Sequence, residues 1–366
     1  MSLTSIHNSM VIVRVDFNLP SLDETFRIEA LLPTIKLLLS QENKVVILTH
    51  WGRPDENNRK ELSVKNMQPM VEKLLGQPVH FINQFDGFEE AEEIIVDAAE
   101  HVFLLENTRF NEDEQSKNAG LRRNLAEKYA TLGQFFVDEA FSVSHRAEAT
   151  NAEIKEFLPH TYGLRHAEER EVLGTLKTNP THPFSVILGG AKGETKLPMI
   201  QKLIDHTDTF LLGGLLAFTF LKAAKNLNLP NIPEIYDSFV EEEFLPTATE
   251  LLKKYPGKIV LPVDIVLNEV EGKKRGCDVG PKTTELFEQI LKNSKTVLWN
   301  GPLGWVEQKP FDASTNQIVL FLSKLDTAYT VIGGGDTAAI IPLELEKNFS
   351  FISTGGGATL EFLGNE

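Results

Sequence analysis

The chain has 366 residues, which is enough for about two domains of ordinary size. Its 36 basic residues against 52 acidic ones give a net charge of −16, which argues against a surface for nucleic acid or anionic membranes. The single cysteine excludes an internal disulfide framework, and neither a secretory signal pattern nor an apolar run of membrane length is visible. We therefore expect a cytoplasmic enzyme.

Short apolar runs alternate with amphipathic stretches along the whole chain, which is typical of a parallel α/β architecture. In the first half the apolar runs predict strands near Val11–Val15, Val45–Leu48, Val102–Leu105 and Phe135–Val137. Helical periodicity predicts helices near Ile28–Leu39, Val64–Leu75 and Ala119–Tyr129. Ser63 is the expected N-cap of the second of these helices, and Gly76 is its expected stop.

The second half repeats this alternation and follows a charged linker. The apolar runs predict strands near Ser185–Leu188, Thr209–Leu212, Ile259–Leu261, Val297–Trp299, Tyr329–Ile332 and Phe351–Ile352. Between the halves, the stretch RHAEEREVLGTLK is followed by a Pro-Thr-His-Pro turn. We interpret this segment as a linker helix over residues 166–180, placed between a first domain (1–165) and a second domain that begins at residue 181.

Basic residues follow the predicted strands of the first half. They are Arg14, His50, Arg53, Arg109, His145 and Arg146. Open α/β sheets bind ligands at the carboxyl ends of their strands, so these side chains are expected to converge. Guanidinium groups bind carboxylate and phosphate oxygens through two hydrogen bonds at once. The first half therefore favours a small anionic substrate.

Glycines follow the predicted strands of the second half, in ILGGAK, LLGGLLAF, LWNGPLG, VIGGGDTA and ISTGGGAT. Glycine lets the backbone approach a ligand closely, and helix N-termini bind phosphate. The stretch ILGGAKGETK lacks the Gly-Lys-Ser/Thr ending of a Walker A loop. A single glycine pair or arginine is more often structural than functional. The sorting of these residues by type into two halves nevertheless favours a nucleotide site in the second half.

Several of these motifs occur together, and in this order, in one known family: VRVDFN, HWGRP, LLENTRF, SHRAEAT, LGGAK, WNGPLG, IGGGDTA and STGGGA. They cover nearly the full length, and the chain resembles phosphoglycerate kinase. The resemblance implies an α/β fold of two doubly wound, Rossmann-like parallel-sheet domains joined by a hinge helix. The phosphoglycerate-binding domain would span residues 1–165 and the nucleotide-binding domain 181–349, with residues 350–366 at the hinge.

The resemblance also implies an activity, a cofactor and the residues that serve them. The enzyme would transfer a phosphoryl group from 1,3-bisphosphoglycerate to ADP in glycolysis, reversibly, giving 3-phosphoglycerate and ATP with Mg²⁺. The phosphoglycerate site would comprise Asp16, Asn18, Arg27, His50, Arg53, Arg109 and Arg146. The nucleotide site would comprise Lys192, Lys196, Gly213, Gly214, Asn300, Glu307, Gly335, Asp336 and Thr337, with Glu307 on the ribose and Asp336 on Mg²⁺. The catalytic residues would be Arg27, Lys192, Gly335 and Gly357.

Two alternative functions are open. A dinucleotide-dependent oxidoreductase is suggested by GGGDTA at residues 333–338, although no acidic residue about 20 positions later ends a further strand. A catalytically inactive nucleotide-binding scaffold is suggested by Thr195, where the family commonly has aspartate, and by the ending LEFLGNE, which lacks the family's usual Leu-Pro-Gly tail. The retention of the substrate arginines favours the enzyme. Its expected partners are small-molecule substrates, without nucleic acid or membrane, and the expected state is a monomer.

Overall fold

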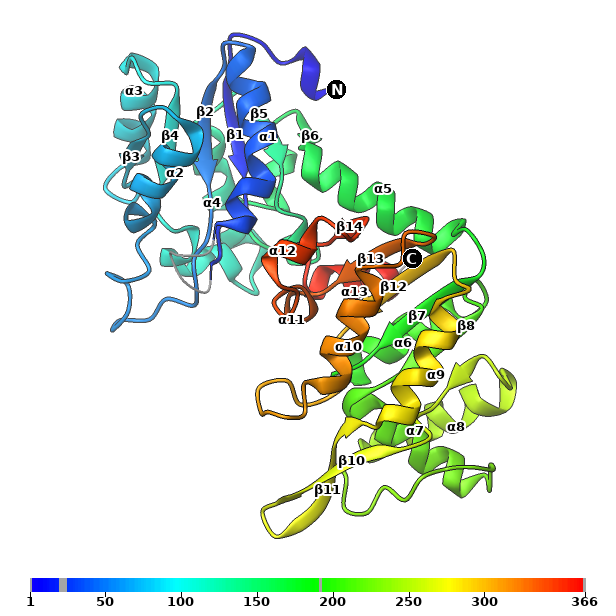
Figure 1. Ribbon diagram of the computed structural model, residues 1–366. Helices are drawn as coiled ribbons and strands as arrows, with labels where there is room; N and C mark the ends of the chain where they lie inside the picture. Colours follow the sequence, from blue (N-terminus) through cyan, green and yellow to red (C-terminus); the bar gives the residue numbers. More distant parts are fainter. Residues whose placement is uncertain (1, 20–24, 191–192, 365–366) are drawn as a thin grey trace. The chain divides into compact units, whose positions relative to one another are not determined.

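The computed structural model describes residues 2–19, 25–190 and 193–364, and for Phe26, Arg27 and Asp336 it describes the backbone alone. The chain forms two compact units, Met1–Glu171 (unit 1) and Val172–Glu366 (unit 2). Helix α5 (Leu164–Thr178) contains the boundary between them (Figure 1). Each unit has its own six-stranded parallel sheet, so the predicted pair of doubly wound α/β sheets is confirmed.

The sheet of unit 1 has the strand order β3-β4-β2-β1-β5-β6. Its strands are β1 (Met10–Arg14), β2 (Lys44–Leu48), β3 (His80–Ile82), β4 (Val102–Leu105), β5 (Phe135–Asp138) and β6 (His160–Tyr162). Its helices are α1 (Phe26–Ser40), α2 (Gln68–Leu75), α3 (Phe88–Asp97) and α4 (Ala119–Ala130). The chain passes from β1 to β2 on one side and places β5 on the other side of β1. Such a reversal is where open α/β sheets bind ligands, at the carboxyl ends of the strands.

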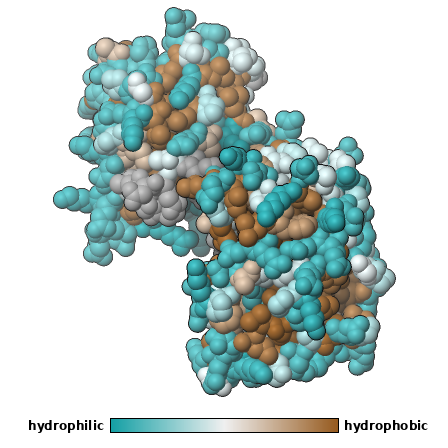
Figure 2. All heavy atoms as spheres, viewed as in Figure 1, coloured by the Kyte–Doolittle hydropathy of each residue, from teal (hydrophilic) through white to brown (hydrophobic). Residues whose placement is uncertain are grey.

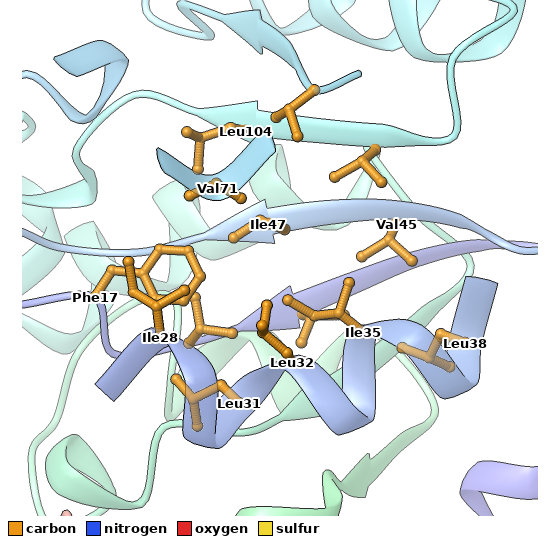
Figure 3. Close-up of a cluster of buried hydrophobic side chains, with 14 of the residues drawn as sticks. Phe17, Ile28, Leu31, Leu32, Ile35, Leu38, Val45, Ile47, Val71 and Leu104 are labelled. Atoms are coloured by element: carbon orange, nitrogen blue, oxygen red, sulfur yellow. The ribbon is translucent and has the colours of Figure 1, made fainter. Parts of the chain in front are cut away.

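Apolar side chains cover both faces of this sheet. Five residues of α1 recur at helical spacing and belong to one buried cluster with Val45 and Ile47 of β2, which Figure 3 shows in close-up: Ile28, Leu31, Leu32, Ile35 and Leu38. Along β1, Val11 and Val13 belong to this cluster, whereas Ile12 belongs to the cluster on the opposite face. A parallel strand that is buried on both faces needs this continuous apolar run, which is why β1 was evident in the sequence.

The sheet of unit 2 has the strand order β14-β13-β12-β7-β8-β9. Its strands are β7 (Phe184–Leu188), β8 (Thr209–Leu212), β9 (Ile259–Val260), β12 (Thr296–Asn300), β13 (Tyr329–Gly333) and β14 (Phe351–Ile352). The helices are α6 (Gly193–Leu203), α7 (Gly214–Asn226), α8 (Leu245–Lys254), α9 (Pro281–Leu291), α10 (Ala313–Leu322), α11 (Gly335–Ala338), α12 (Leu343–Glu346) and α13 (Gly357–Gly364). The winding reverses at β7, which lies between β8 and β12. The loop that carries LGGAK therefore begins at the reversal point.

Three features of the fold were not predicted. The strands β3 and β6 have three residues each and lie at the two edges of their sheet, so they are too short to show a pattern. The antiparallel hairpin of β10 (Ile265–Val270) and β11 (Lys273–Val279) has mostly half-exposed or exposed side chains and a charged turn. Such a strand pair offers no continuous apolar run.

The predicted helix Val64–Leu75 is present at the expected residues, but its first turn is not α-helical. It starts as a 3-10 turn over Val64–Met67 and continues as α2, which ends at Gly76 with a φ of 72°. The side chain of Ser63 does not cap the turn, because its hydroxyl donates to Oε2 of Glu106 at 2.5 Å. A distant carboxylate has replaced the local cap that the sequence predicts.

Hydrophilic residues cover most of the face of both units that Figure 2 shows, with smaller apolar areas between them. Large apolar side chains that are exposed come from separate elements, and they include Ile94, Leu121, Phe239 and Leu343. Within the described ranges, no helix is both long enough and apolar enough to cross a membrane.

Candidate active site

Polar side chains that follow four parallel strands of unit 1 form one connected group. Asp16 and Asn18 follow β1, His50 follows β2, Arg109 follows β4, and Arg146 follows β5. The carboxyl ends of parallel strands lie along one edge of the sheet, and this is why residues far apart in the sequence meet. Five of the predicted substrate residues are brought together in this way.

Asp16 and Asn18 tie the loop after β1 to its neighbours. Oδ1 of Asp16 accepts from the backbone N–H of Asn18 at 2.9 Å, and Oδ2 accepts from the hydroxyl of Ser142 in the loop after β5. Oδ1 of Asn18 accepts from the backbone N–H of Gly52, in the loop after β2, at 2.8 Å. Asp16 and Asn18 therefore hold the loop after β1 against the loops after β5 and β2.

Glu148 connects the arginines of the site, although it was not among the predicted site residues. Its side chain is 1% exposed, and its Oε1 accepts from Nη2 of Arg109 at 3.2 Å. Its Oε2 accepts from Nη2 of Arg14 at 3.2 Å, and Nη1 of Arg146 lies 3.9 Å from Oε1. Burial alone would raise the pKa of Glu148, but Arg14 and the other nearby positive charges lower it below its usual value. The carboxylate is therefore ionised at neutral pH.

Arg14 links the loops of the site through hydrogen bonds inside unit 1. It is fully buried, and each nitrogen of its guanidinium donates to a group of unit 1. Nε donates to Thr150 Oγ1 at 3.0 Å, Nη1 to the carbonyl of Val15 at 2.5 Å, and Nη2 to Nδ1 of His50 at 3.1 Å as well as to Glu148. Arg14 is thus an internal cross-link between strand ends.

The contact with Arg14 determines the tautomer of His50. A guanidinium can only donate, so Nδ1 of His50 must accept and cannot carry a proton. The ring proton then resides on Nε2, which lies 3.8 Å from Oδ1 of Asp16. Burial lowers the pKa of His50 from 6.5 to about 3, with Arg14 and Arg109 acting in the same direction and Asp16 in the opposite one. His50 therefore acts as a neutral donor.

We expect the His50 imidazole to stay neutral from pH 8 to pH 5, with its proton on Nε2. Nitrogen-15 NMR of the ring should show constant Nδ1 and Nε2 shifts over this range, whereas protonation near pH 6.5 would contradict the assignment. The unfolded chain takes up this proton below about pH 6.5, and the native protein does so only near pH 3. His50 therefore lowers the free energy of unfolding as the pH falls through that window, by at most about 1.4 kcal/mol per pH unit.

The arginines of the predicted site differ in how they are held. Arg109 is 8% exposed, and its Nη1 also donates to the carbonyl of Gly52 at 2.8 Å. Its buried Nε has no hydrogen-bond partner among the described residues. Arg146 is 43% exposed, and Arg53 is exposed in the loop after β2. Arg27 lies in the first turn of α1, and its side chain is outside the described part of the structure.

In unit 2, the glycine loops after β7, β8 and β12 lie directly against one another. The backbone N–H of Gly190 donates to the carbonyl of Pro302 at 2.6 Å, and that of Gly214 donates to the carbonyl of Leu303 at 2.8 Å. A Cβ on Gly189 would lie 2.0 Å from the Pro302 oxygen, and one on Gly214 would lie 2.2 Å from the Gly190 nitrogen. The glycines therefore allow close backbone packing between loops, in addition to any approach to a ligand.

Replacing Gly214 with alanine is expected to destabilise unit 2 by about 2–5 kcal/mol, through its φ of +58° and the overlap with Gly190. Gly257 is a matched control, because it has a φ of +81° and nothing lies within 4 Å of its Cβ position. Gly257→Ala should cost only about 1–2 kcal/mol, the penalty of the left-handed conformation. Urea unfolding measures the free energy of unfolding of both variants. Equal losses of this free energy in the two variants would contradict the packing argument.

The predicted nucleotide residues that are described lie around these loops. Lys196, in the first turn of α6, is 4% exposed, and its Nζ is 2.6 Å from the position of a Cβ on Gly301. Nδ2 of Asn300 donates to the carbonyl of Gly333 at 2.6 Å, and the Thr337 hydroxyl accepts from the Gly301 N–H at 2.6 Å. Lys196 therefore places a positive charge where the loops meet.

The remaining predicted residues can be placed only in part. Gly335 begins the short helix α11, and Gly357 begins α13 and is exposed. Asp336 belongs to α11, but its side chain is outside the described part of the structure. Lys192 lies outside the described residues altogether.

A pocket of about 700 Å³ opens beside the glycine loops of unit 2. Its lining is mostly apolar and includes Leu215, Phe218, Pro302, Leu303 and Val279. Two predicted residues, Gly214 and Glu307, also line it, and the hairpin β10–β11 contributes one wall. A volume of this size with few polar groups suits a small ligand with a flat apolar part and a polar part.

Comparison with known proteins identifies the family of this chain. A family model described as phosphoglycerate kinase matches residues 1–366. The chain is 38% identical to the phosphoglycerate kinase of Salinispora tropica over 377 residues, which cover 96% of this chain and 92% of that protein. It is 36% identical to the phosphoglycerate kinase of Finegoldia magna, with coverages of 98% and 94%. The solved structure of phosphoglycerate kinase from Coxiella burnetii matches with a TM-score of 0.82 at 32% identity, covering 100% of this chain and 96% of that one. The chain therefore belongs to the phosphoglycerate kinase family and is a phosphotransferase of glycolysis.

Proposed function

We propose that this kinase binds 3-phosphoglycerate and 1,3-bisphosphoglycerate at the strand ends of unit 1, and ADP and ATP at the glycine loops of unit 2. The supporting observation is the separation of two kinds of chemistry. Unit 1 gathers Arg109, Arg146 and the neutral donor His50 at one sheet edge, around Glu148. Unit 2 has a buried lysine and an apolar pocket beside its glycine loops. The first arrangement suits a small acid, and the second suits a nucleotide.

Phosphoryl transfer requires positioning and charge stabilisation rather than a covalent intermediate on the protein. The reacting nucleophile is an oxygen of the bound acid or of the nucleotide. Arg109 and His50 would hold the acid, and Lys196 would bind phosphate oxygens of the nucleotide. Arg27 and Lys192 would stabilise the negative charge on the transferring group. Glu307, which lines the pocket, would accept hydrogen bonds from the ribose.

Mg²⁺ would enter with the nucleotide. Magnesium in kinases is usually held by one or two carboxylates together with the substrate's phosphates. The sequence offers Asp336 for this purpose, at the start of α11. The neighbouring Thr337 hydroxyl accepts from the backbone N–H of Gly301 and donates to the carbonyl of Gly333, which fixes the start of α11. A carboxylate is the ligand type that Mg²⁺ prefers, and Asp336 is the residue that would hold the ion.

The enzyme assay that tests this proposal measures ATP formation from 1,3-bisphosphoglycerate and ADP, with Mg²⁺ present and after its chelation. We expect turnover that is lost with the chelator and restored when Mg²⁺ is added back. Absence of ATP above background would instead favour the scaffold alternative, which the family relationship does not support.

We also propose that the protein is a cytoplasmic monomer. Analytical ultracentrifugation tests the oligomeric state, and we expect a mass near 40.9 kDa.

A further inference from the structure

The carboxylate of Glu148 holds two binding groups of unit 1 at once. Its Oε1 accepts from Arg109 at 3.2 Å and from Nε2 of Gln115 at 2.5 Å. Its Oε2 accepts from Arg14, and the same Nη2 of Arg14 reaches Nδ1 of His50 at 3.1 Å. One buried carboxylate therefore connects directly to Arg109 and, through Arg14, to His50.

We propose that Glu148 is a positioning residue for 3-phosphoglycerate binding, because it orients the Arg109 fork and fixes the donor tautomer of His50. This inference rests on the proposed function, in which Arg109 and His50 contact the acid. With Nη1 on the Gly52 carbonyl and Nη2 on Glu148, the guanidinium plane of Arg109 is fixed at both ends. The orientation that results leaves its Nε–H without a partner among the described residues.

The charge of Glu148 works against anion binding, which separates its positioning effect from simple attraction. Three guanidinium groups lie within 4.0 Å of this one carboxylate, those of Arg14, Arg109 and Arg146. A carboxylate in this place lowers the positive potential that an anionic substrate would meet. If charge alone mattered, removing the negative charge of Glu148 would strengthen substrate binding. If the positioning of Arg109 and His50 matters more, removing the same charge weakens substrate binding.

Glu148→Gln keeps the shape of the side chain and removes its charge. We expect the KM for 3-phosphoglycerate to rise about tenfold or more, since small displacements of binding groups cost up to about 10²-fold. The KM for ATP should stay unchanged. In nitrogen-15 spectra, the His50 ring should show a mixture of tautomers, because Nη2 of Arg14 loses its charged partner and holds Nδ1 less firmly, although Thr150 and Val15 still accept from Arg14. A purely structural role would not change the tautomer.

Glu153→Gln is the matched control. Glu153 is also a buried glutamate of unit 1 that pairs with an arginine, at 2.5 Å from Nη2 of Arg122, but it does not contact the strand-end group. Glu153→Gln should lower the free energy of unfolding without changing the KM for 3-phosphoglycerate or for ATP.

If Glu148→Gln does not fold, Gln115→Met tests the same role. This substitution removes one hydrogen bond to the Glu148 carboxylate while the carboxylate keeps its charge, and it should raise the KM for 3-phosphoglycerate several-fold.

An unchanged or lower KM for 3-phosphoglycerate in a folded Glu148→Gln protein would overturn the positioning role, and so would an unchanged KM in Gln115→Met. Failure of the proposed function has a different signature. In that case Arg109→Ala would also leave the KM for 3-phosphoglycerate unchanged. A defect in Arg109→Ala without one in Glu148→Gln would refute only the inference about Glu148.

Discussion

Replacing Lys192 with alanine is expected to lower kcat by about 10³-fold, while the free energy of unfolding stays close to that of the wild type. Loss of a cation that stabilises the transferring phosphoryl group costs about this much in enzymes of this reaction type. Lys192 immediately precedes α6, and the variant keeps the buried residues that pack this helix: Leu197, Met199, Ile200 and Leu203. Steady-state kinetics together with urea unfolding check both parts of the prediction.

Lys202→Ala is the control for this variant, because Lys202 is an exposed lysine near the end of the same helix. It removes the same charge from unit 2 and should leave kcat unchanged. A well-folded Lys192→Ala protein with turnover near that of the wild type would show that Lys192 does not serve the transferring group. A loss of the same size in Lys202→Ala would point to net charge rather than position.

Arg109→Ala is expected to lower kcat/KM for 3-phosphoglycerate by about 10² to 10³-fold. Truncating one partner of a buried, charge-assisted hydrogen bond costs about 2–5 kcal/mol, and the anionic substrate would lose such a partner. Glu148 would keep Arg14 and Gln115 as donors, so the carboxylate would not be left unpaired. Kinetics at varied 3-phosphoglycerate with saturating ATP measure the effect.

Two further variants separate the substrate effect from general loss of charge. Arg109→Lys keeps the charge without the planar fork, and we expect an intermediate loss. Arg123→Ala removes an exposed arginine of α4 that pairs with Glu156 at 3.0 Å, and it should behave like the wild type. If Arg109→Ala retains most of its kcat/KM, the strand ends of unit 1 are not the acid site.

The strand ends could be predicted because two strong patterns coincide there. β1, β2 and β4 are buried apolar runs, and the residues that follow them are a small set of arginines, histidines and glycines. Asp16, His50 and Arg109 were therefore selected from the sequence, and the structure connects them in one network. Their roles as ligands of the substrate stay predictions.

Glu148 was missed because a buried carboxylate has no sequence pattern of its own. It stands two residues after Arg146, where an acidic residue reads as an ordinary loop charge. Its partners Arg14 and Arg109 come from strands that are distant in the chain, and only the sheet order brings them together. The one signal in the sequence was an acidic residue two positions after an arginine in a loop that follows a strand.

The glycine loops show a different limit of sequence reasoning. Glycine after a strand indicates close approach, but the sequence does not say what approaches. At Gly189 and Gly214 the nearest atoms are the backbone of other loops. The hairpin β10–β11 was missed for a related reason, since its half-exposed strands form one wall of the apolar pocket without being part of a buried sheet.

The central claim is that the two ligands bind to different units of one chain. Isothermal titration of the wild-type and Arg109→Ala proteins with 3-phosphoglycerate, and separately with ADP and Mg²⁺, tests this claim most directly. We predict that Arg109→Ala binds 3-phosphoglycerate at least about 30-fold more weakly, as expected from the loss of about 2 kcal/mol or more, and that its affinity for ADP is unchanged. Equal weakening of both ligands, or an unchanged affinity for 3-phosphoglycerate, would contradict the account.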